Sequence, residues 1–407
     1  MLPEQQGDLQ RKMRLVGAGW LFTGLAIGIT DYPLKFLLKG ELALKPSELA
    51  GFIALANIPI YIKPLAGILS DTVPLFGSRR RNYLLLGLSS MAALAFTLGF
   101  APHRYGLLLA VYIIMNVFGV LISTVLGGLM VDTAQEYSGM GRLSAQRVGI
   151  GRFVGLVAGP AGAFLSQFPF RWVMTLCAAL NGLLVPLFAR QLREPPIAPR
   201  VRSEVLIEAG RQCRTLVRSR TLWAAAGLVA LIIAAPGFGT PLLYYQVDVL
   251  KFSKADLGVL SLVSGVFGMA GAALYAFCCS RIPLWRLLTI SIVVHAVGTL
   301  FYLGYRSFPS ALAITAIEGV AQTLAILPLY DLAARATPRG SEALGYSVMM
   351  SVWNLTAALS DLTGAYLHDK YHLTILNLVW LNAGTTALIL VAVPFLPAAL
   401  MLRRDGE

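Results

Sequence analysis

The amino-acid sequence predicts an all-α membrane protein with twelve transmembrane helices, arranged as two six-helix pseudo-repeats. Hydrophobic residues make up 57% and charged residues 13% of the 407 residues, whereas soluble domains carry about 25% charged residues. Stretches of about 20 apolar residues, long enough to cross about 30 Å of hydrocarbon, recur along the chain. Short matches between the first and second halves of the chain indicate an internal repeat.

Polar or turn-forming segments separate the apolar stretches. The expected spans are 15–38, 47–70, 83–102, 105–132, 147–166, 171–190, 221–246, 256–280, 284–304, 308–331, 341–367 and 373–401. The polar segment after the sixth span starts with the Pro-rich run EPPIAPR and continues with apolar residues at helical spacing opposite arginines. We therefore expect an N-terminal half over residues 1–190, a cytoplasmic linker with an amphipathic helix over 191–220, and a C-terminal half over 221–407.

The net charge of +13 lies mainly in alternate loops, including the arginine run 79–81 and the arginine-rich segment 190–220. Cytoplasmic loops of membrane proteins carry an excess of Lys and Arg. The pattern predicts a multi-pass protein of the cell inner membrane with both termini in the cytoplasm. It also explains the positive charge without a nucleic-acid partner.

The internal repeat rests on pairs of short matches that are offset by about 200 residues. Pro33-Leu34 corresponds to Pro241-Leu242, and Asp132-Thr133-Ala134 corresponds to Asp331-Leu332-Ala333. Their common order favours a parallel repeat of six helices. Halves related in this way can rock about an axis along the membrane normal, so a central cavity opens to either side.

The most specific motif extends from Asn57 to Gly87. Its glycines, its aspartate and its arginine run resemble the loop signature of the major facilitator superfamily between the second and third helices: Gly67, Asp71, Gly77 and Arg79 to Arg81. The longer run Pro59-x-x-x-Lys63-Pro-Leu-x-Gly67, followed by Ser-Asp-x-x-Pro-x-x-Gly-x-Arg-Arg, resembles the folate-biopterin transporter family within that superfamily. The resemblance covers residues 20–165.

The resemblance implies a major facilitator fold and a secondary active transporter, a symporter that moves a pterin-like or folate-like organic anion by proton-coupled alternating access. It also implies an inner gate and a repeat-related residue in the second half. These residues are Asp71, Arg79, Arg80, Arg81 and Asp132 for the gate, and Asp331 for its counterpart.

Ionisable residues inside membrane spans cost roughly 2.5–3.5 kcal/mol by insertion scales, so each is a candidate for function. The candidates for substrate binding are Lys63, Arg152, Asn57, Asn116, Asn354, Asp31 and Lys35, and those for proton coupling are Glu318 and His295. Lys63 and Arg152 have no acidic residue within one helical turn, which suits an anionic substrate. Asp31 and Lys35 could equally form a structural i,i+4 ion pair, and His295 could be a packing residue.

Two alternatives remain open from the sequence. The substrate could be another metabolite or a drug, or the chain could be a non-transporting assembly or pigment-delivery factor. The insertion cost of buried charges argues against a pure scaffold. We expect no enzyme activity, metal or other cofactor, because GIGRFVG at 149–155 follows no strand and the cysteines lack ligand spacing. The expected partners are the organic anion, a proton and membrane lipid, around a monomer.

Overall fold

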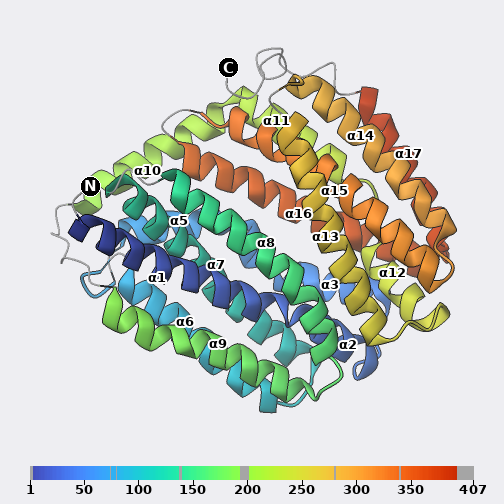
Figure 1. Cartoon of the computed structure of the whole chain (residues 1–407), viewed down its shortest axis with the longest axis horizontal. Helices are drawn as coiled ribbons and strands as arrows, with labels where there is room; N and C mark the ends of the chain where they lie inside the picture. The colour runs from blue at the N-terminus through green and yellow to red at the C-terminus, as the bar shows by residue number, and fades with distance from the viewer. Residues whose placement is uncertain are drawn as a thin grey trace. The chain divides into compact units, whose positions relative to one another are not determined.

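The computed structural model describes residues 3–73, 75–78, 80–136, 140–192, 201–278, 281–338 and 341–391. Across these ranges the chain is a succession of helices (Figure 1), and pairing between extended residues is limited to a single bridge of Leu75 with Ser78. The predicted all-α class is confirmed.

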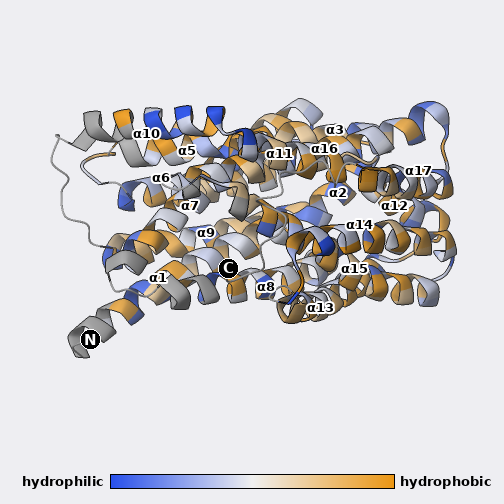
Figure 2. Cartoon of the chain, turned by 90° about the horizontal axis from the view of Figure 1, so that it is seen from above, coloured by the Kyte–Doolittle hydropathy of each residue, from blue (hydrophilic) through white to orange (hydrophobic). Residues whose placement is uncertain are grey.

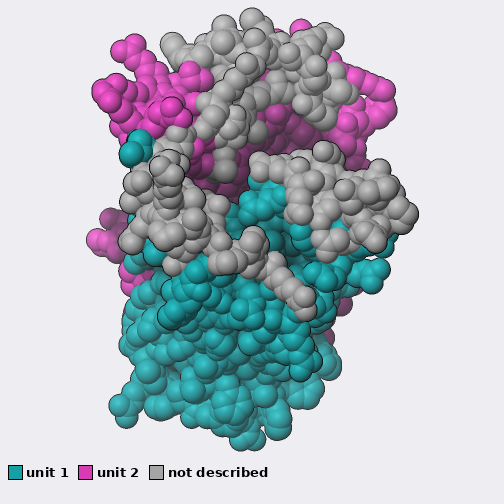
Figure 3. Space-filling view, turned by 90° about the vertical axis from the view of Figure 1, so that its left-hand side faces the viewer, with its two compact units in different colours: residues 1–42, 56–210 teal, residues 43–55, 211–407 magenta. Residues whose placement is uncertain are grey.

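The chain divides into two compact units, residues 1–42 with 56–210 and residues 43–55 with 211–407 (Figure 3). Unit 1 contains α1 (Pro3–Gly28), α2 (Asp31–Gly40), α4 (Ile58–Tyr61), α5 (Lys63–Thr72), α6 (Arg81–Phe100), α7 (Tyr105–Glu136), α8 (Met140–Leu165) and α9 (Phe170–Gln191). Helix α1 packs on α7, α8 and α9, and α6 packs on α7 and α9.

Small residues allow the helices of unit 1 to approach closely. A Cβ atom on Gly28 of α1 would lie 2.5 Å from the Cβ of Ala158 on α8. A Cβ on Gly162 would lie 3.0 Å from the carbonyl oxygen of Ile29. Membrane helices associate through such contacts because lipid leaves little hydrophobic driving force between them.

Unit 2 contains α3 (Pro46–Ala56), α11 (Arg220–Ile233), α12 (Gly239–Tyr244), the π-helical turn η1 (Tyr245–Val249), α13 (Lys254–Cys278), α14 (Leu284–Leu300), η2 (Phe301–Gly304), α15 (Phe308–Ala336), α16 (Glu342–Tyr371), α17 (Ile375–Leu388) and η3 (Ile389–Val391). Its core joins α11, α14, α15 and α16 through fully buried side chains such as Leu222, Leu288 and Leu332. Helix α10 (Val201–Arg218) forms in the predicted linker and carries alternating polar and apolar residues (Figure 2).

The segment 43–55 packs with unit 2, although we expect the N-terminal half to extend over residues 1–190. The amide of Ser47 donates to Oδ2 of Asp369 over 2.8 Å, and the hydroxyl of Tyr244 donates to the carbonyl oxygen of Leu44. These bonds connect residues that are far apart in sequence, so helix patterning could not show them.

Two expected spans are broken. The span 47–70 is divided into α3, α4 and α5, and 221–246 into α11, α12 and η1, whereas only residues 29–30 separate α1 from α2, which together form one candidate span over Leu9–Gly40. Pro59 and Pro64 lie in the first turns of α4 and α5, where a missing N–H is tolerated. At this break, Nδ2 of Asn116 donates to the carbonyl of Ala56 over 2.8 Å and to Oδ1 of Asn57 over 3.2 Å.

The break between α11 and α12 is held by side chains from α16 and α17. Asp361 accepts from the amide of Thr240 over 2.9 Å and from its hydroxyl over 2.5 Å. Asn382 donates to the carbonyl of Pro236 over 3.0 Å, and the Ser360 hydroxyl donates to the carbonyl of Ala235 over 2.6 Å. Non-helical backbone at membrane depth needs partners of this kind, because lipid supplies none.

In the described part of the chain, eight helices are long and apolar enough to cross a membrane, or up to nine if the bent pair α10 and α11 counts as one. The broken helices and the more polar α16 account for part of the difference from twelve, so the twelve-span count and the repeat stay predictions. Large apolar side chains remain exposed on the helices, for example Leu183 at 63% and Trp380 at 60%. Apolar residues also cover α13, α14 and α15 (Figure 2), as contact with lipid requires.

Candidate functional site

A tight turn joins α5 to α6 at the predicted cytoplasmic end of unit 1. Gly77 has a φ of +78°, a conformation that a side chain would strain, so a glycine is required there. Nδ2 of Asn82 donates to the carbonyl of Leu75 over 2.9 Å, and the hydroxyl of Tyr83 donates to the carbonyl of Val73 over 2.7 Å. The predicted gate residue Asp71 lies on α5 with its side chain outside the described part, and Arg79 lies outside it entirely.

The next arginine of the run forms an ion pair across unit 1. Nε of Arg80 donates to Oδ2 of Asp132 on α7 over 3.1 Å. The Arg80 side chain is 7% exposed and the Asp132 side chain 51%. Gly128 leaves room for the guanidinium, since a Cβ there would lie 2.5 Å from Cζ of Arg80. Gly128 and Asp132 are one turn apart on α7 and together form a slot for the arginine.

The other predicted gate residues have different surroundings. Nη2 of Arg81 donates to the carbonyl of Ala189 near the end of α9 over 2.9 Å. This bond fixes the start of α6 to the end of α9. Asp331 is half-buried and lies near the end of α15. Asp132 lies near the end of α7 but is exposed.

The cations predicted to bind substrate lie on unit 1. Lys63, at the start of α5, is half-buried and lies within electrostatic range of Arg147 on α8. Arg152, also on α8, is exposed. Among the residues that the structure describes, neither Lys63 nor Arg152 forms an ion pair.

The polar candidates fall into separate places. Asn57 and Asn116 are hydrogen-bonded to each other at the break before α4. Asp31 and Lys35 form the i,i+4 ion pair, with Nζ 2.8 Å from Oδ2, on the short helix α2. Asn354 is half-buried on α16 in unit 2.

Glu318 and His295, the predicted proton-coupling residues, both belong to unit 2. Glu318 on α15 lies against α14, because a Cβ on Gly298 would be 3.0 Å from its Oε2. His295 precedes Gly298 by three residues, so both lie on the same side of α14. Oε2 of Glu318 and Nδ1 of His295 are buried and have no hydrogen-bond partner within the described ranges. The Tyr302 side chain also lies within electrostatic range of Glu318.

Several residues of these sites are not evident from sequence reasoning. Gly128 could have been found from its spacing of four before Asp132, which places both on one helix face. Asp361 appears in the sequence only as one more polar residue of a span, and its role depends on the break in a distant helix. Asn82 and Tyr83 follow the arginine run directly, but only the folded turn shows what they hold.

Comparison with solved structures defines the class of fold. The chain superposes on a nucleoside transporter with a TM-score of 0.73 at 14% identity, covering 95% of this chain and 99% of that one. A D-xylose-proton symporter gives a TM-score of 0.72 at 16% identity, with coverage of 98% and 99%. The protein therefore has the fold of the major facilitator transporters.

Residues 23–402 match the BT1 family, and the chain belongs to that family. It is 28% identical to the folate-biopterin transporter of Synechocystis sp. over 91% of this chain and 78% of that protein. It is 23% identical to folate transporter 1 of Plasmodium falciparum, over 86% of this chain and 71% of that protein. The resemblance to folate-biopterin transporters is confirmed, and the family assignment makes the chain a membrane transport protein and not an enzyme.

Proposed function

We propose that this secondary transporter moves a small organic anion of the pterin or folate type across the inner membrane by proton-coupled alternating access. The names of its relatives support the substrate class, and the major facilitator fold supports the transport mode. The observation that carries the proposal is that two cations of unit 1 form no ion pair with any described residue.

Lys63 and Arg152 are the cations in question. A charged group inside a membrane protein is costly unless it meets an opposite charge, water or a polar ligand. Since the described residues supply no ion pair to either side chain, an anionic substrate would complete the site. Asn57 and Asn116 are the neutral polar groups of unit 1 that we assign to the same substrate, and Asn354 of unit 2 stays a predicted binding residue.

Proton coupling is assigned to Glu318. A buried carboxyl group without a hydrogen-bond partner is unfavourable as an anion, and it can take up and release a proton as its surroundings change. Oε2 of Glu318 has this character, and His295 lies on the facing helix α14. We propose that the protonation state of Glu318 changes once in each transport cycle.

The Arg80–Asp132 pair is proposed to act in the inner gate with Asp71, Arg79 and Arg81, with Asp331 in the corresponding place of the second half. An ion pair at the cytoplasmic end of the helices stabilises the state in which it forms over the state in which it is broken. Its charges should therefore affect the transport step more than the affinity for substrate.

Two measurements on the purified full chain test the proposal. In a thermal-unfolding screen, folate, pterins or related organic anions should raise the melting temperature, because a ligand that binds the folded state stabilises it. In proteoliposomes, an imposed pH gradient should drive accumulation of the same compound, and a proton ionophore should abolish it. Protein-free liposomes give the control. Stabilisation only by uncharged compounds, or uptake that ignores the pH gradient, would contradict the proposal.

A further inference from the structure

We infer that Trp20 and Arg147 form a binding site for a planar aromatic anion within unit 1, with the indole as a platform for the ring and the guanidinium as the group that holds its charge. The inference rests on the proposed transport of a pterin-like or folate-like anion, and it names the residues that bind the ring and the charge of that anion. From the sequence alone, Arg147 is one of the basic residues that are expected to set the membrane topology.

Trp20 and Arg147 come from different helices. The guanidinium carbon of Arg147 on α8 lies 4.7 Å from the ring centroid of Trp20 on α1. By contrast, Arg286 lies over Trp285 at 5.1 Å and Arg171 over Trp172 at 5.7 Å, and in both cases the partners are adjacent in sequence. The Trp20–Arg147 contact therefore depends on the fold of unit 1, whereas the other two follow from local sequence.

The Trp20 indole also offers an unused hydrogen-bond donor. Its Nε1 is buried, and the described residues give it no acceptor. A buried donor without a partner is uncommon and unfavourable, since water has been removed and nothing replaces it. A polar ring atom or a carboxylate of a ligand would satisfy it.

The positive charge at this place is not neutralised by the described part of the chain. Arg147 is exposed and forms no ion pair with a described residue, and Lys63 is close enough for the two charges to interact. Two like charges near each other in a membrane protein repel, so an anion between them relieves an unfavourable interaction. The pair therefore favours an anionic ligand over a neutral one.

Contacts with α7 place Lys63 and Trp20 at a similar depth within unit 1. A Cβ on Gly67 of α5 would lie 3.6 Å from Thr124 on α7, and a Cβ on Gly19 of α1 would lie 2.7 Å from Leu126 on α7. Lys63 is one turn from Gly67, and Trp20 follows Gly19, so both are near the same level of α7.

The face of α8 beyond Arg147 is open. Gly151 and Gly155 follow Arg147 at intervals of four residues and so lie on the same side of the helix. A Cβ on either glycine would meet no atom of the described residues within 4 Å. A flat ligand can therefore lie along this face with its charged end at Arg147.

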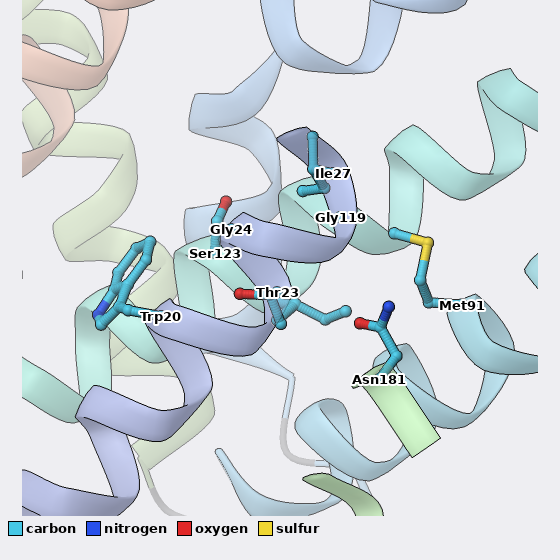
Figure 4. A pocket seen from close by; sticks show the side chains of 9 residues that line it. Trp20, Thr23, Gly24, Ile27, Met91, Gly119, Ser123 and Asn181 are labelled. Atoms are coloured by element: carbon cyan, nitrogen blue, oxygen red, sulfur yellow. The ribbon is translucent and has the colours of Figure 1, made fainter. Parts of the chain in front are cut away.

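A small cavity of about 80 Å³ borders Trp20 between α1, α6, α7 and α9 (Figure 4). Its polar side chains bond to their own helices: Thr23 donates to Gly19, Ser123 to Val120 and Asn181 to Cys177. Packed interiors leave few voids larger than a water molecule. Because Trp20 lines this cavity, the cavity leaves room for the indole to shift when a ligand binds.

Binding to the purified full chain tests the assignment with three probes: folic acid, pterin-6-carboxylate and the aliphatic anion L-glutamate. The wild type should bind the two aromatic anions more tightly than glutamate. Trp20→Leu should weaken binding of the aromatic probes about tenfold, the scale of one lost aromatic stack, and leave glutamate unchanged. Arg147→Gln should weaken the binding of folic acid and pterin-6-carboxylate at least tenfold.

The matched controls are Trp285→Leu and Arg286→Gln, which remove the same side chains from a local pair in unit 2 and should bind all probes like the wild type. If Trp20→Leu fails to fold, Trp20→Phe serves instead: a bound pterin should quench indole fluorescence in the wild type and in Trp285→Phe, and should quench it much less in Trp20→Phe.

Three outcomes would overturn the assignment. If the wild type binds folic acid and the Trp20 and Arg147 variants bind it equally well, the site lies elsewhere while the proposed function stands. If Trp20→Leu weakens the binding of glutamate as much as the binding of the aromatic probes, Trp20 has a structural role and does not stack on the ligand. If the wild type binds none of the three probes, the proposed function fails and this site fails with it.

Discussion

Arg80 and Asp132 are ion-paired across unit 1, with Nε 3.1 Å from Oδ2, although they are separated by 52 residues in the sequence. The arginine is almost completely buried and the aspartate is half exposed. Gly128, one turn before Asp132, supplies the space in which the guanidinium lies. The pair therefore depends on a glycine as well as on two charges.

Gly128→Ala should impair transport to about the same extent as Arg80→Ala. The added Cβ would lie 2.5–2.7 Å from three guanidinium atoms, so the end of the Arg80 side chain must move away from Asp132. Gly127→Ala is the matched control, because a Cβ at Gly127 meets nothing within 4 Å. Initial rates of uptake in proteoliposomes measure both. Equal rates in the two glycine variants would show that the slot has no part in transport.

Asp132→Asn should lower the transport rate while leaving the affinity for substrate close to that of the wild type. A half-exposed ion pair is worth about 1 kcal/mol, which corresponds to roughly a fivefold change in the ratio of the two gate states. Uptake rates and equilibrium binding, measured on the same preparation, separate the two effects. A parallel loss of binding, in protein that is still folded, would place Asp132 in the substrate site.

Much of the fold is predictable from the sequence, because a membrane-spanning helix requires a long apolar stretch that can be recognised there. The all-α class and the transporter family are confirmed. The breaks before α4 and before α12 are not evident, since each depends on a distant side chain that hydrogen-bonds to the freed backbone, as Asn116 and Asp361 do. The assignment of segment 43–55 to unit 2 likewise depends on Asp369 and Tyr244 rather than on local pattern.

Less of the candidate site can be predicted. The cost of burying charge singles out Lys63, Arg152 and Glu318 from sequence alone, and their roles stay predictions. The contact of Arg147 with Trp20 could not be foreseen, because an arginine near a helix end is usually a topology signal. The spacing of Gly128 and Asp132 is visible in the sequence, but nothing there indicates which arginine lies against them.

Asp361→Ala should destabilise the protein by about 2 kcal/mol, since the carboxylate accepts two hydrogen bonds at the break before α12. Thr240→Val removes only the hydroxyl bond and should cost about 1 kcal/mol. Unfolding of the purified protein by SDS titration measures both free energies. Asp256→Ala, which removes a local cap at the start of α13, is the control and should cost about 1 kcal/mol. If Asp361→Ala lowers the free energy of unfolding no more than this control does, the break between α11 and α12 does not depend on the carboxylate.

Single cysteines at Phe76 and Lys370 should react with an impermeant thiol reagent from opposite sides of the membrane. Phe76 is 90% exposed in the turn before the arginine run, and Lys370 is exposed near the end of α16. The background is a variant without Cys177, Cys213, Cys278 and Cys279. Phe76→Cys should label from the cytoplasmic side and Lys370→Cys from outside. Labelling of both from one side would disprove the predicted topology.

Glu318→Gln should abolish uptake driven by a pH gradient and retain exchange of substrate for substrate. The glutamine keeps the size of the side chain, so contact with Gly298 on α14 is preserved, but it cannot carry the coupled proton. Exchange needs only that the loaded carrier change state, whereas net accumulation needs a site that is protonated on one side and deprotonated on the other. The matched variant is Asp256→Asn, a carboxyl in the same unit that caps α13 and should keep both activities. His295→Gln, measured in the same assays, tests whether the imidazole also carries the coupled proton. If this variant loses pH-driven uptake and keeps exchange, His295 belongs to the proton-coupling site. If Glu318→Gln still accumulates substrate fully in response to a pH gradient, Glu318 has no part in proton coupling. Its Oε2, which has no hydrogen-bond partner among the described residues, would then have only a structural role.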